Sequence, residues 1–304
     1  MRNNRAKTIE ENTPEIDTIL IADVGSTKAD WMAVGADGPL SQGFTSQGFN
    51  ASTCPDTRIR EALAKAVSKS EDFAPVTVYL YGAGCGNPMI CSHIAAILKE
   101  EFKCASAEAN SDMLGAARAL LGNQPGIACI LGTGSNTCLY NGTSIIDNIP
   151  PMGCILGDEG SGAYLGKQLL NALYKRRLPS SLLKEFEAEY ALSLPKVIEE
   201  VYRKPAPGGF LGSLAPFILE HIDAEGMEEM VADSFNLFIT SNLLGYHGAR
   251  EVPVAFVGSV AFHFRKYLRE ALQRHGLTCG EILRQPIQRL AEFHQRNEKI
   301  EKAQ

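Results

Sequence analysis

The first clear hydrophobic pattern is a run of apolar and β-branched residues at 18–24, which is typical of a strand buried on both faces. The run ends in a Gly-Ser-Thr turn. A second apolar stretch at 30–34 is followed by Asp37-Gly38, a pair that favours a tight hairpin turn, and a third stretch lies near 40–45. The pattern predicts three consecutive strands joined by hairpins.

Beyond residue 50, helical and strand-like patterns alternate. Apolar residues recur at helical spacing over 58–68, 87–102 and 113–121, and a short apolar run at 76–81 ends in Gly-Ala-Gly. This alternation is typical of proteins in which helices cover a sheet. The first part of the chain is therefore predicted to be α/β.

Two glycine-rich breaks flank a hairpin in the middle of the chain. An apolar run at 127–131 enters Gly-Thr-Gly-Ser-Asn at 132–136, the chain turns at 141–142, and Gly-Asp-Glu-Gly-Ser-Gly follows at 157–162. Beyond this break the spacing predicts helices at 164–175, 181–190, 196–204, 211–222 and 227–246. A last buried strand at 253–257 leads through a glycine turn into a helix at 261–275.

The strand-and-turn pattern occurs twice. Residues 21–27 can be aligned with residues 130–136, so that a buried strand enters a Gly-Ser turn and opens a hairpin in both places. One such match carries little information, but two matches about a hundred residues apart are the mark of a repeated unit. The repetition predicts duplicated domains that face one ligand.

Glycine-rich turns of this kind can bind phosphate. Glycine has no Cβ and adopts positive φ, so successive backbone N–H groups can converge on an anion. Here the hydroxyls of Thr133 and Ser135 add further donors. Such turns are also common in hairpins that bind nothing. The turn at 258–260 is similarly open to two interpretations, a surface for a flat ring or a tight turn only.

Asp112 precedes the helix predicted at 113–121. A carboxylate at this end of a helix is stabilised as the anion by the free N–H groups of the first turn. Position alone therefore leaves two interpretations, a helix cap and a functional acid.

Length and charge narrow the class of partner. The 304 residues suffice for two domains of about 100 to 200 residues each, which predicts two cores and a cleft. A net charge of −6 and a pI near 5.6 give no support to a nucleic-acid-binding face or a membrane-surface patch. We therefore expect a small-molecule partner.

The cysteines indicate the compartment. The eight cysteines include no C-x-x-C pair and no signal peptide is recognisable, which is typical of reduced thiols in the cytoplasm. No apolar stretch reaches the ~18 residues of a membrane helix. We expect a cytoplasmic protein with a mobile polar tail at 1–16 and six histidines in structural or surface roles.

Together these motifs resemble a known family. Asp23-x-Gly-Ser-Thr-Lys28 and the breaks at 132–136, 157–161 and 258–260 are similar in order and separation to those of the N-acetylglucosamine kinase-like proteins. These proteins form a branch of the BadF/BadG/BcrA/BcrD ATPases, within the superfamily of sugar kinases, heat-shock ATPases and actin. The resemblance extends over residues 18–294.

The resemblance implies an α/β fold of two ribonuclease H-like (actin-like ATPase) domains with ATP in the cleft between them. The N-terminal domain would span 17–120, and the C-terminal domain, with a helical insertion, 121–286. The last helix, at 287–296, would pack back on the first domain. The family also implies a homodimer.

The nucleotide-binding positions of the family can be carried over residue by residue. Asp23 would hold Mg²⁺ through water, since this cation prefers oxygen ligands and keeps part of its hydration shell. Two turns would hold the phosphates and a third would border the adenine. The residues implied are Gly25, Ser26, Thr27, Lys28, Gly132, Thr133 and Gly134 for the phosphates, and Gly258 and Ser259 for the adenine.

The sugar site follows from the same resemblance. Asp112 matches the catalytic aspartate that accepts the proton of the attacking hydroxyl, which favours the functional acid over the helix cap. Asn50, Asn136 and Asp158 match positions that bind the sugar hydroxyls and the acetamido group, whereas Glu159 has no assigned role. The implied reaction is phosphorylation of N-acetylglucosamine or N-acetylmuramic acid at the 6-hydroxyl by ATP.

Two alternatives stay open. ATPase activators of acyl-CoA reductases and dehydratases share this branch, and they carry an iron–sulfur cluster that needs paired cysteine ligands. Cys129, Cys138 and Cys154 lie near the predicted core but form no visible pair. The other alternative is a sugar-binding protein without catalysis. Asp112 together with Asp158 favours a hydroxylated substrate, and hence the kinase.

Overall fold

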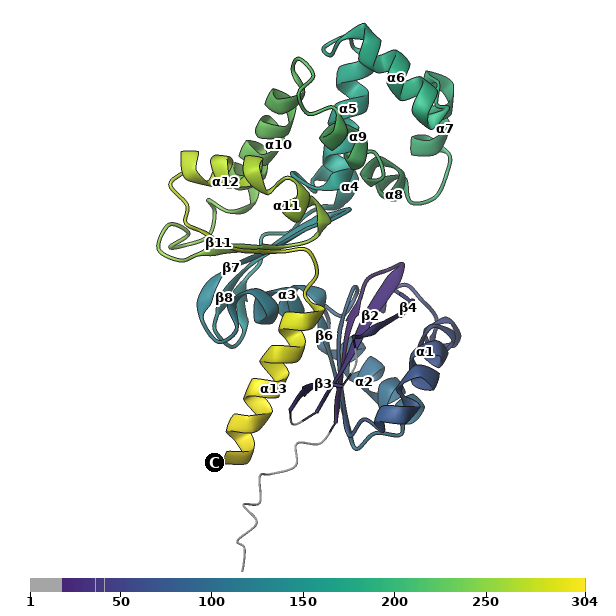
Figure 1. The fold of residues 1–304 in the computed structure, drawn as a ribbon, viewed down its shortest axis with the longest axis vertical. Helices are drawn as coiled ribbons and strands as arrows, with labels where there is room; N and C mark the ends of the chain where they lie inside the picture. Colours follow the sequence, from purple (N-terminus) through teal and green to yellow (C-terminus); the bar gives the residue numbers. More distant parts are fainter. Residues whose placement is uncertain (1–17, 36, 41, 304) are drawn as a thin grey trace, which may run out of the picture.

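The computed structural model describes residues 18–35, 37–40 and 42–303, so the tail predicted at 1–16 lies outside the described residues. Two β-sheets lie one above the other in Figure 1, each with helices on its faces. The chain builds the lower sheet first and then the upper one. It returns to the lower sheet with its last helix, α13 (Ile287–Ala303).

The first sheet has the strand order β3-β2-β1-β5-β6, and β4 also pairs with β2. β1 runs antiparallel to β2 and parallel to β5, which in turn runs parallel to β6. The strands are β1 (Ile19–Val24), β2 (Lys28–Gly35), β3 (Gly38–Pro39), β4 (Phe44–Gln47), β5 (Thr77–Gly82) and β6 (Ser106–Ser111).

The single strand expected near 40–45 is wrong, because β3 already ends at residue 39 and, of the described residues in this stretch, only 44 and 45 belong to a strand, β4; both strands pair with β2. Gly43, just before β4, has a φ of 81°, and a Cβ there would lie 2.8 Å from the carbonyl oxygen of Trp31. The chain bends closely over β2 at this glycine, which ends any continuous strand.

Both faces of the first sheet are covered, as the apolar run at 18–24 predicts. Leu20 and Ala22 pack with α1 (Asp56–Ser70) and α2 (Pro88–Phe102). Ile19 and Ile21 point to the other face and pack with α13 and α3 (Asp112–Leu121). Alternate residues of one strand therefore serve two different cores.

The second sheet has the order β11-β10-β7-β8-β9. β7 is antiparallel to β8 and parallel to β10, and β10 is parallel to β11. The series β8-β7-β10-β11 thus repeats the order and directions of β2-β1-β5-β6, which confirms the predicted duplication. The strands are β7 (Pro125–Leu131), β8 (Ser135–Asn141), β9 (Ile145–Asp147), β10 (Val254–Val257) and β11 (Cys279–Leu283). The sequence patterns did not predict β9 or β11.

Helix α3 lies between the two sheets. Met113, Ala117 and Leu120 pack on β7, β8 and β10, while Ala119 packs with β1 and α13. Leu114 contacts both cores. Because α3 is shared in this way, the boundary at residues 120 and 121 stays a prediction.

A helical insertion separates β9 from β10. Helices α5 and α10 cover the far face of the second sheet together with α12, and α6 and α7 stand away from it (Figure 1). The insertion consists of α4 (Gly153–Leu156), α5 (Gly162–Tyr174), α6 (Ser180–Tyr190), α7 (Leu194–Tyr202), α8 (Pro207–Gly212), α9 (Ala215–Glu220) and α10 (Met227–Asn242).

Two predicted helices are divided in the structure. The helix expected at 211–222 is replaced by α8 and α9, because Pro216 has no N–H for a continuing helix and instead stands in the first turn of α9. The helix expected at 261–275 is divided at Phe264 into α11 (Ser259–His263) and α12 (Arg265–Arg274).

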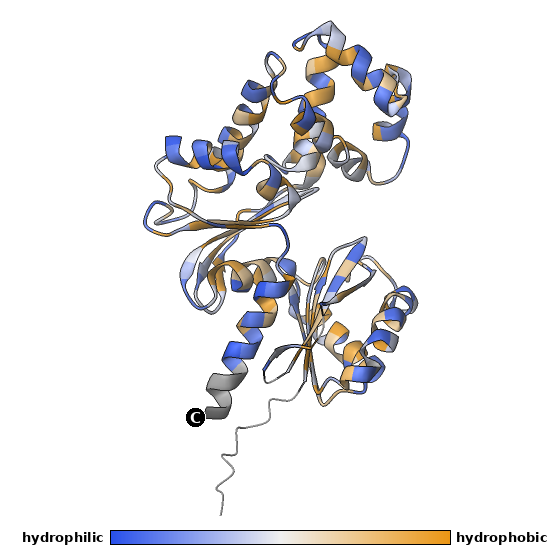
Figure 2. Ribbon diagram, in the orientation of Figure 1, coloured by the Kyte–Doolittle hydropathy of each residue, from blue (hydrophilic) through white to orange (hydrophobic). Residues whose placement is uncertain are grey.

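The hydropathy of the elements matches this arrangement. Figure 2 shows hydrophobic residues along the strands of both sheets, whereas α12 is mostly hydrophilic. Within the described part of the chain, no helix has both the length and the apolar character needed to cross a bilayer.

Candidate functional site

The turn between β1 and β2 carries the first set of predicted phosphate-binding residues. Gly25 N donates to Lys28 O over 2.9 Å, and Gly48 N donates to Thr27 O over 3.0 Å. A Cβ at Gly48 would lie 2.0 Å from Gly25 O, so only glycine fits against the turn. The N–H groups of Ser26 and Thr27 donate to no acceptor among the described residues. They are available to an anion.

The turn between β7 and β8 is built in the same way. Gly132 N donates to Gly134 O over 3.0 Å, and the carbonyl groups of Gly132 and Thr133 accept bonds from Gly162 N and Ala163 N at the start of α5. The second glycine-rich break therefore holds the first one in place. Within the described chain, the N–H groups of Thr133 and Gly134 donate to no acceptor.

The structure aligns the two turns differently from the sequence prediction, by a shift of two residues. β1 ends at Val24 and β7 at Leu131, so Gly25 is equivalent to Gly132. The alignment of residues 21–27 with 130–136 placed Asp23 opposite Gly132, which is wrong because Asp23 lies inside β1. The pattern of hydrophobic residues does not specify how many strand residues precede each turn.

A cleft of about 390 Å³ lies between the two sheets. Six predicted site residues line it: Asp23, Gly25, Lys28, Asp112, Gly258 and Ser259. Asp30 on β2 and the loop at 284–286, between β11 and α13, line it as well. The cleft thus combines carboxylates from the first sheet and α3 with a glycine turn from the second half.

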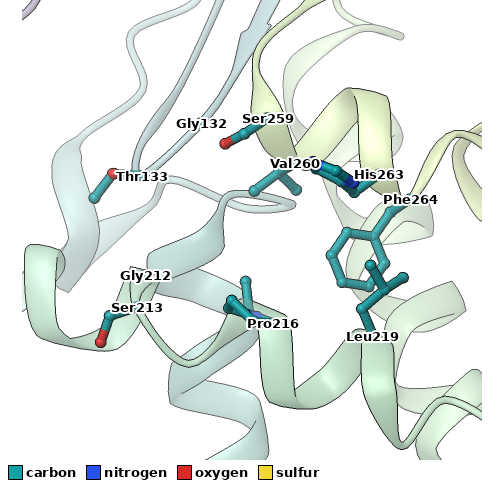
Figure 3. A pocket seen from close by; sticks show the side chains of 11 residues that line it. Gly132, Thr133, Gly212, Ser213, Pro216, Leu219, Ser259, Val260, His263 and Phe264 are labelled. Carbon is teal, nitrogen blue, oxygen red and sulfur yellow. The ribbon is translucent and has the colours of Figure 1, made fainter. Parts of the chain in front are cut away.

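A second cavity, of about 300 Å³, lies within the C-terminal half (Figure 3). The polar side chains of Thr133, Ser213 and Ser259 lie on one side of it, and Phe264 and Leu219 lie on the other. Gly132 also lines it. Ser259 lines both cavities, which therefore lie next to each other at the start of α11.

Gly258 makes this junction possible. Its φ is 130°, and a Cβ would lie 2.2 Å from Leu131 O at the end of β7. Its N–H donates to Leu283 O over 3.0 Å. The strand ends of β7, β10 and β11 are therefore held together around one glycine, which no larger residue could replace without moving the backbone.

Burial and acidic neighbours raise the proton affinity of Asp23 in the cleft. Asp23 and Asp30 are directly opposite each other in the β1–β2 pair. Burial, with the neighbouring Asp30 and Asp112 carboxylates, raises the pKa of Asp23 to about 7, although Lys28 acts in the opposite direction. Lys28 Nζ lies 2.8 Å from Asp30 Oδ1, so its charge is already paired. As a phosphate ligand, Lys28 stays a prediction.

Asp112 is the first residue of α3, but it is not the cap. Ser111 Oγ accepts the bond from Leu114 N over 3.2 Å and fills that role, while Asp112 Oδ1 accepts from Met113 N over 2.8 Å. Burial raises the pKa of Asp112, and the backbone hydrogen bonds only reduce this effect. The helix begins with a separate cap, which leaves the second carboxylate oxygen of Asp112 for another partner.

The predicted sugar residues lie outside the cleft. Asn50 Oδ1 accepts bonds from Ser52, at 3.0 Å from its N and 2.7 Å from its Oγ. Asn136 Oδ1 accepts from Thr137 N over 2.9 Å and from Asn148 Nδ2 over 3.1 Å. Neither residue lines either cavity, and neither do Ser26, Thr27, Gly134 and Asp158.

Asp158 lies behind the β7–β8 turn. It is buried, has a φ of 54°, and its Oδ1 is 3.4 Å from the donor Ser135 N. Burial raises its pKa. The neighbouring Glu159 accepts a bond from Asn242 Nδ2 on α10 over 3.1 Å. A buried carboxylate held in a strained conformation is typical of functional sites.

The potential metal ligands of the cleft are carboxylate oxygens. The described residues include no group of three or more His, Cys, Asp or Glu side chains that could hold a metal ion. Asp23 and Asp30 nevertheless offer oxygen ligands on one face of β1 and β2, where burial and the neighbouring carboxylates raise the pKa of Asp23. This donor set fits a magnesium ion that keeps most of its ligands as water and phosphate.

The cysteines are placed differently. Cys129 and Cys138 are completely buried in β7 and β8, and burial raises the pKa of Cys129 well above the ordinary value. Cys129 and Cys138 lie in two different cores of the same chain, and thiols buried in this way cannot ligate a cluster shared between two subunits. This geometry disfavours the activator alternative.

The sequence patterns missed Asp30 and Arg284 in the cleft. Asp30 could have been found by pairing the predicted hairpin, which places it opposite Asp23. Arg284 follows β11, a strand with no clear pattern, so no local signal marks it.

The sequence matches no protein-family model and none of the curated proteins with which it was compared. Solved structures do match. A protein from Porphyromonas gingivalis, provisionally assigned as an N-acetylglucosamine kinase, is 41% identical, with a TM-score of 0.87 over 92% of this chain and 99% of its own. A similarly assigned protein from Chromobacterium violaceum is 21% identical, with a TM-score of 0.67 over 91% and 99%.

A glucokinase of the ROK family from Streptomyces griseus, solved with glucose and AMPPNP, is 14% identical, with a TM-score of 0.53 over 92% of this chain and 98% of its own. At this identity the likeness concerns the fold alone. The expected fold of two ribonuclease H-like halves of the actin-like ATPase type is confirmed.

Proposed function

This chain belongs to the N-acetylglucosamine kinase-like family that includes the Porphyromonas gingivalis protein, and from that premise we propose that it is an ATP-dependent sugar kinase. Its substrate is an N-acetylated hexosamine, phosphorylated at the 6-hydroxyl. N-Acetylglucosamine and N-acetylmuramic acid are the two sugars that fit the proposal.

The observation that carries the proposal is the junction of the two cavities at Ser259. A nucleotide can lie across it, with the adenine between Phe264 and the α8–α9 break and the phosphates directed into the cleft. We assign the free N–H groups of the two turns to the phosphates once the two halves approach each other, because of these residues only Thr133 lines either cavity in this structure. Gly258 and Ser259 border the nucleotide where it crosses.

Asp23 is assigned to the hydrated magnesium ion of the nucleotide, with Asp30 beside it. Bound magnesium would neutralise part of the negative charge of the phosphates. The high pKa of Asp23 supports this role, because a nearby cation would favour the ionised carboxylate.

Asp112 is assigned as the general base. Its Oδ1 is occupied by Met113 N, and we assign Oδ2 to the proton of the sugar 6-hydroxyl. A raised pKa brings a carboxylate closer to the working pH, which makes it a better base. The hydroxyl loses its proton as its oxygen attacks the γ-phosphorus.

Asn50, Asn136 and Asp158 are assigned to the hydroxyl and acetamido groups of the sugar. Since these residues line neither cavity in this structure, the two halves must approach each other before all three contact one sugar. Domain closure around substrates is common in kinases of two lobes.

The test is product formation. The protein is incubated with Mg-ATP and N-acetylglucosamine, ADP release is followed with and without the sugar, and the position of the phosphate is found by NMR. We expect sugar-dependent ADP release and phosphate on the 6-oxygen. Equal ADP release without the sugar would refute the kinase, and phosphate on the anomeric oxygen would refute the proposed geometry.

A further inference from the structure

Arg284 follows β11 and enters the cleft from the second half of the molecule. Val257 at the end of β10 pairs with Leu283 at the end of β11, and Gly258 N donates to Leu283 O over 3.0 Å. These contacts fix Arg284 beside the Gly258–Ser259 turn. Both the arginine and that turn line the cleft that contains Asp23 and Asp112.

The two cationic residues of this cleft differ in their pairing. Lys28 Nζ is bound to Asp30 Oδ1 at 2.8 Å. Arg284, in contrast, has no hydrogen bond and no ion pair with any described residue. An arginine that lines one cleft with three carboxylates, yet is bonded to none of them, keeps its donors available for an incoming anion.

Polar side chains near Arg284 in the sequence do form ion pairs and hydrogen bonds. Arg289, one turn into α13, binds Glu281 at 2.7 Å and Glu292 at 2.9 Å. Gln285 Nε2 lies 3.5 Å from Asp30 Oδ2. Arg284 therefore differs from Gln285 and Arg289, whose side chains are engaged, and it lines the cleft to which the proposed phosphates are assigned.

We infer that Arg284 binds the γ-phosphoryl group and neutralises the charge that develops on it during transfer. This inference rests on the proposed function. In the step, the sugar oxygen forms a bond to the γ-phosphorus, and the bond from that phosphorus to the bridging oxygen breaks with its electron pair remaining on ADP. The hydroxyl proton goes to Asp112. Arg284 donates to the equatorial oxygens throughout.

An arginine suits this task for geometric reasons. Its planar fork can donate two parallel bonds to phosphate oxygens, whereas the ammonium group of a lysine acts as a point charge. In phosphoryl transfer most of the protein's contribution is positioning and charge stabilisation. The contact discriminates ATP from ADP, because only ATP carries the γ-phosphoryl group.

The experiment compares Arg284→Gln and Arg284→Lys with the wild type, and uses Arg289→Gln as a matched control for the loss of one positive charge nearby. We measure kcat, the KM for N-acetylglucosamine, and the Kd of Mg-ATP and Mg-ADP by calorimetry. Arg284→Gln should lower kcat about 10²- to 10³-fold and weaken ATP binding more than ADP binding. Arg284→Lys should recover part of both effects, and Arg289→Gln should change neither.

The nucleotide readout separates this inference from the proposed function. If the wild type transfers phosphate to no sugar, the ratio of the Kd values for ATP and ADP still tests Arg284. An unchanged ratio in Arg284→Gln would overturn the inference, and so would a kcat equal to that of the wild type in a protein that does phosphorylate its sugar. Melting curves of all three variants establish that they are folded.

Discussion

At residue 112, a carboxylate occupies the first position of a helix whose cap is supplied by its neighbour Ser111. The two residues can therefore be tested separately. Asp112→Asn keeps the size of the side chain and can still accept the Met113 N–H, but it cannot take a proton. We expect kcat to fall about 10²- to 10⁴-fold, with the Kd of Mg-ATP changed little, measured by coupled assay and calorimetry.

Ser111→Ala is the matched control for Asp112→Asn. Loss of the cap should cost about 1 kcal/mol of the free energy of unfolding while kcat stays near that of the wild type. If Asp112→Asn keeps more than roughly a tenth of the wild-type kcat, below the usual effect of removing a base, the residue has only a structural role.

Asp23 gives a prediction for pH. Its pKa is about 7 in the folded protein and about 3.9 in an unfolded chain, so the folded state binds the proton more tightly. The resulting stability is complete below pH 4 and is lost as the pH rises through 7. Asp23→Asn, which resembles the protonated acid, should exceed the wild type in stability at pH 8 by up to about 4 kcal/mol, but not at pH 4.

This difference is measured by urea unfolding without magnesium or nucleotide. The same variant should lose magnesium-dependent activity. A variant less stable than the wild type at pH 8 would show that the fold favours the charged form of Asp23, which contradicts a raised pKa for this carboxyl.

At the scale of single residues, the sequence identified candidate site residues that lie in motifs, but it did not show which other residues lie beside them. Asp23, Asp112 and Ser259 were found from their motifs, and the structure places them in one cleft. Asp30 and Arg284 lie in no motif, because their positions follow from strand pairing and from a loop after an unmarked strand. The unpaired state of Arg284 and the pairing of Lys28 are properties of three-dimensional contacts that one sequence does not record.

At the scale of elements, a buried polar group joins α13 to α3 and to β5 of the first sheet. Tyr81 OH on β5 accepts from Arg118 Nη1 on α3 over 2.6 Å and lies 2.8 Å from His294 Nε2 on α13. Since Arg118 can only donate, the tyrosine proton goes to His294, and burial, together with Arg118, lowers the pKa of that histidine to about 3. These hydrogen bonds, in which His294 is neutral, fix α13 against the first sheet.

Tyr81→Phe should therefore destabilise the fold. The change leaves buried donors and acceptors of His294 and Arg118 without a partner, which typically costs about 1 to 3 kcal/mol. The free energy of unfolding is measured in urea at pH 7.5. As a control, Tyr267→Phe removes a surface bond to Glu228 and should cost less than about 0.5 kcal/mol; equal effects of the two changes would contradict the role of the group.

Elements with strong periodicity were predicted well, and weaker ones were not. The apolar run at 18–24 and the helical spacing at 87–102 correspond closely to β1 and α2. Sequence spacing did not reveal β11, which is only partly buried. The division of the helix expected at 211–222 could have been predicted from Pro216. The apolar spacing on both sides of this proline suggested one helix instead.

At the scale of the molecule, two similar sheets carry equivalent turns. Gly25 of the first turn lines the cleft between the sheets, and Gly132 and Thr133 of the second turn line the neighbouring cavity. The duplication was predicted from the repeated turn, whereas the sharing of α3 by both sheets depends on packing and was not. Because the assigned sugar residues line neither cavity, we expect the sugar and a nucleotide together to bring the halves closer. Small-angle scattering should show a smaller radius of gyration with both ligands, and identical radii would contradict closure.

The central claim, a cleft built for an N-acetylated hexosamine, is tested most directly by the ratio of kcat/KM for N-acetylglucosamine to that for glucose at saturating Mg-ATP. Sites that hydrogen-bond a substrate group reject analogues that lack it, by factors that can reach about 10⁴. We predict a strong preference for N-acetylglucosamine, with N-acetylmuramic acid as the informative third sugar. Equal or better use of glucose would contradict this claim.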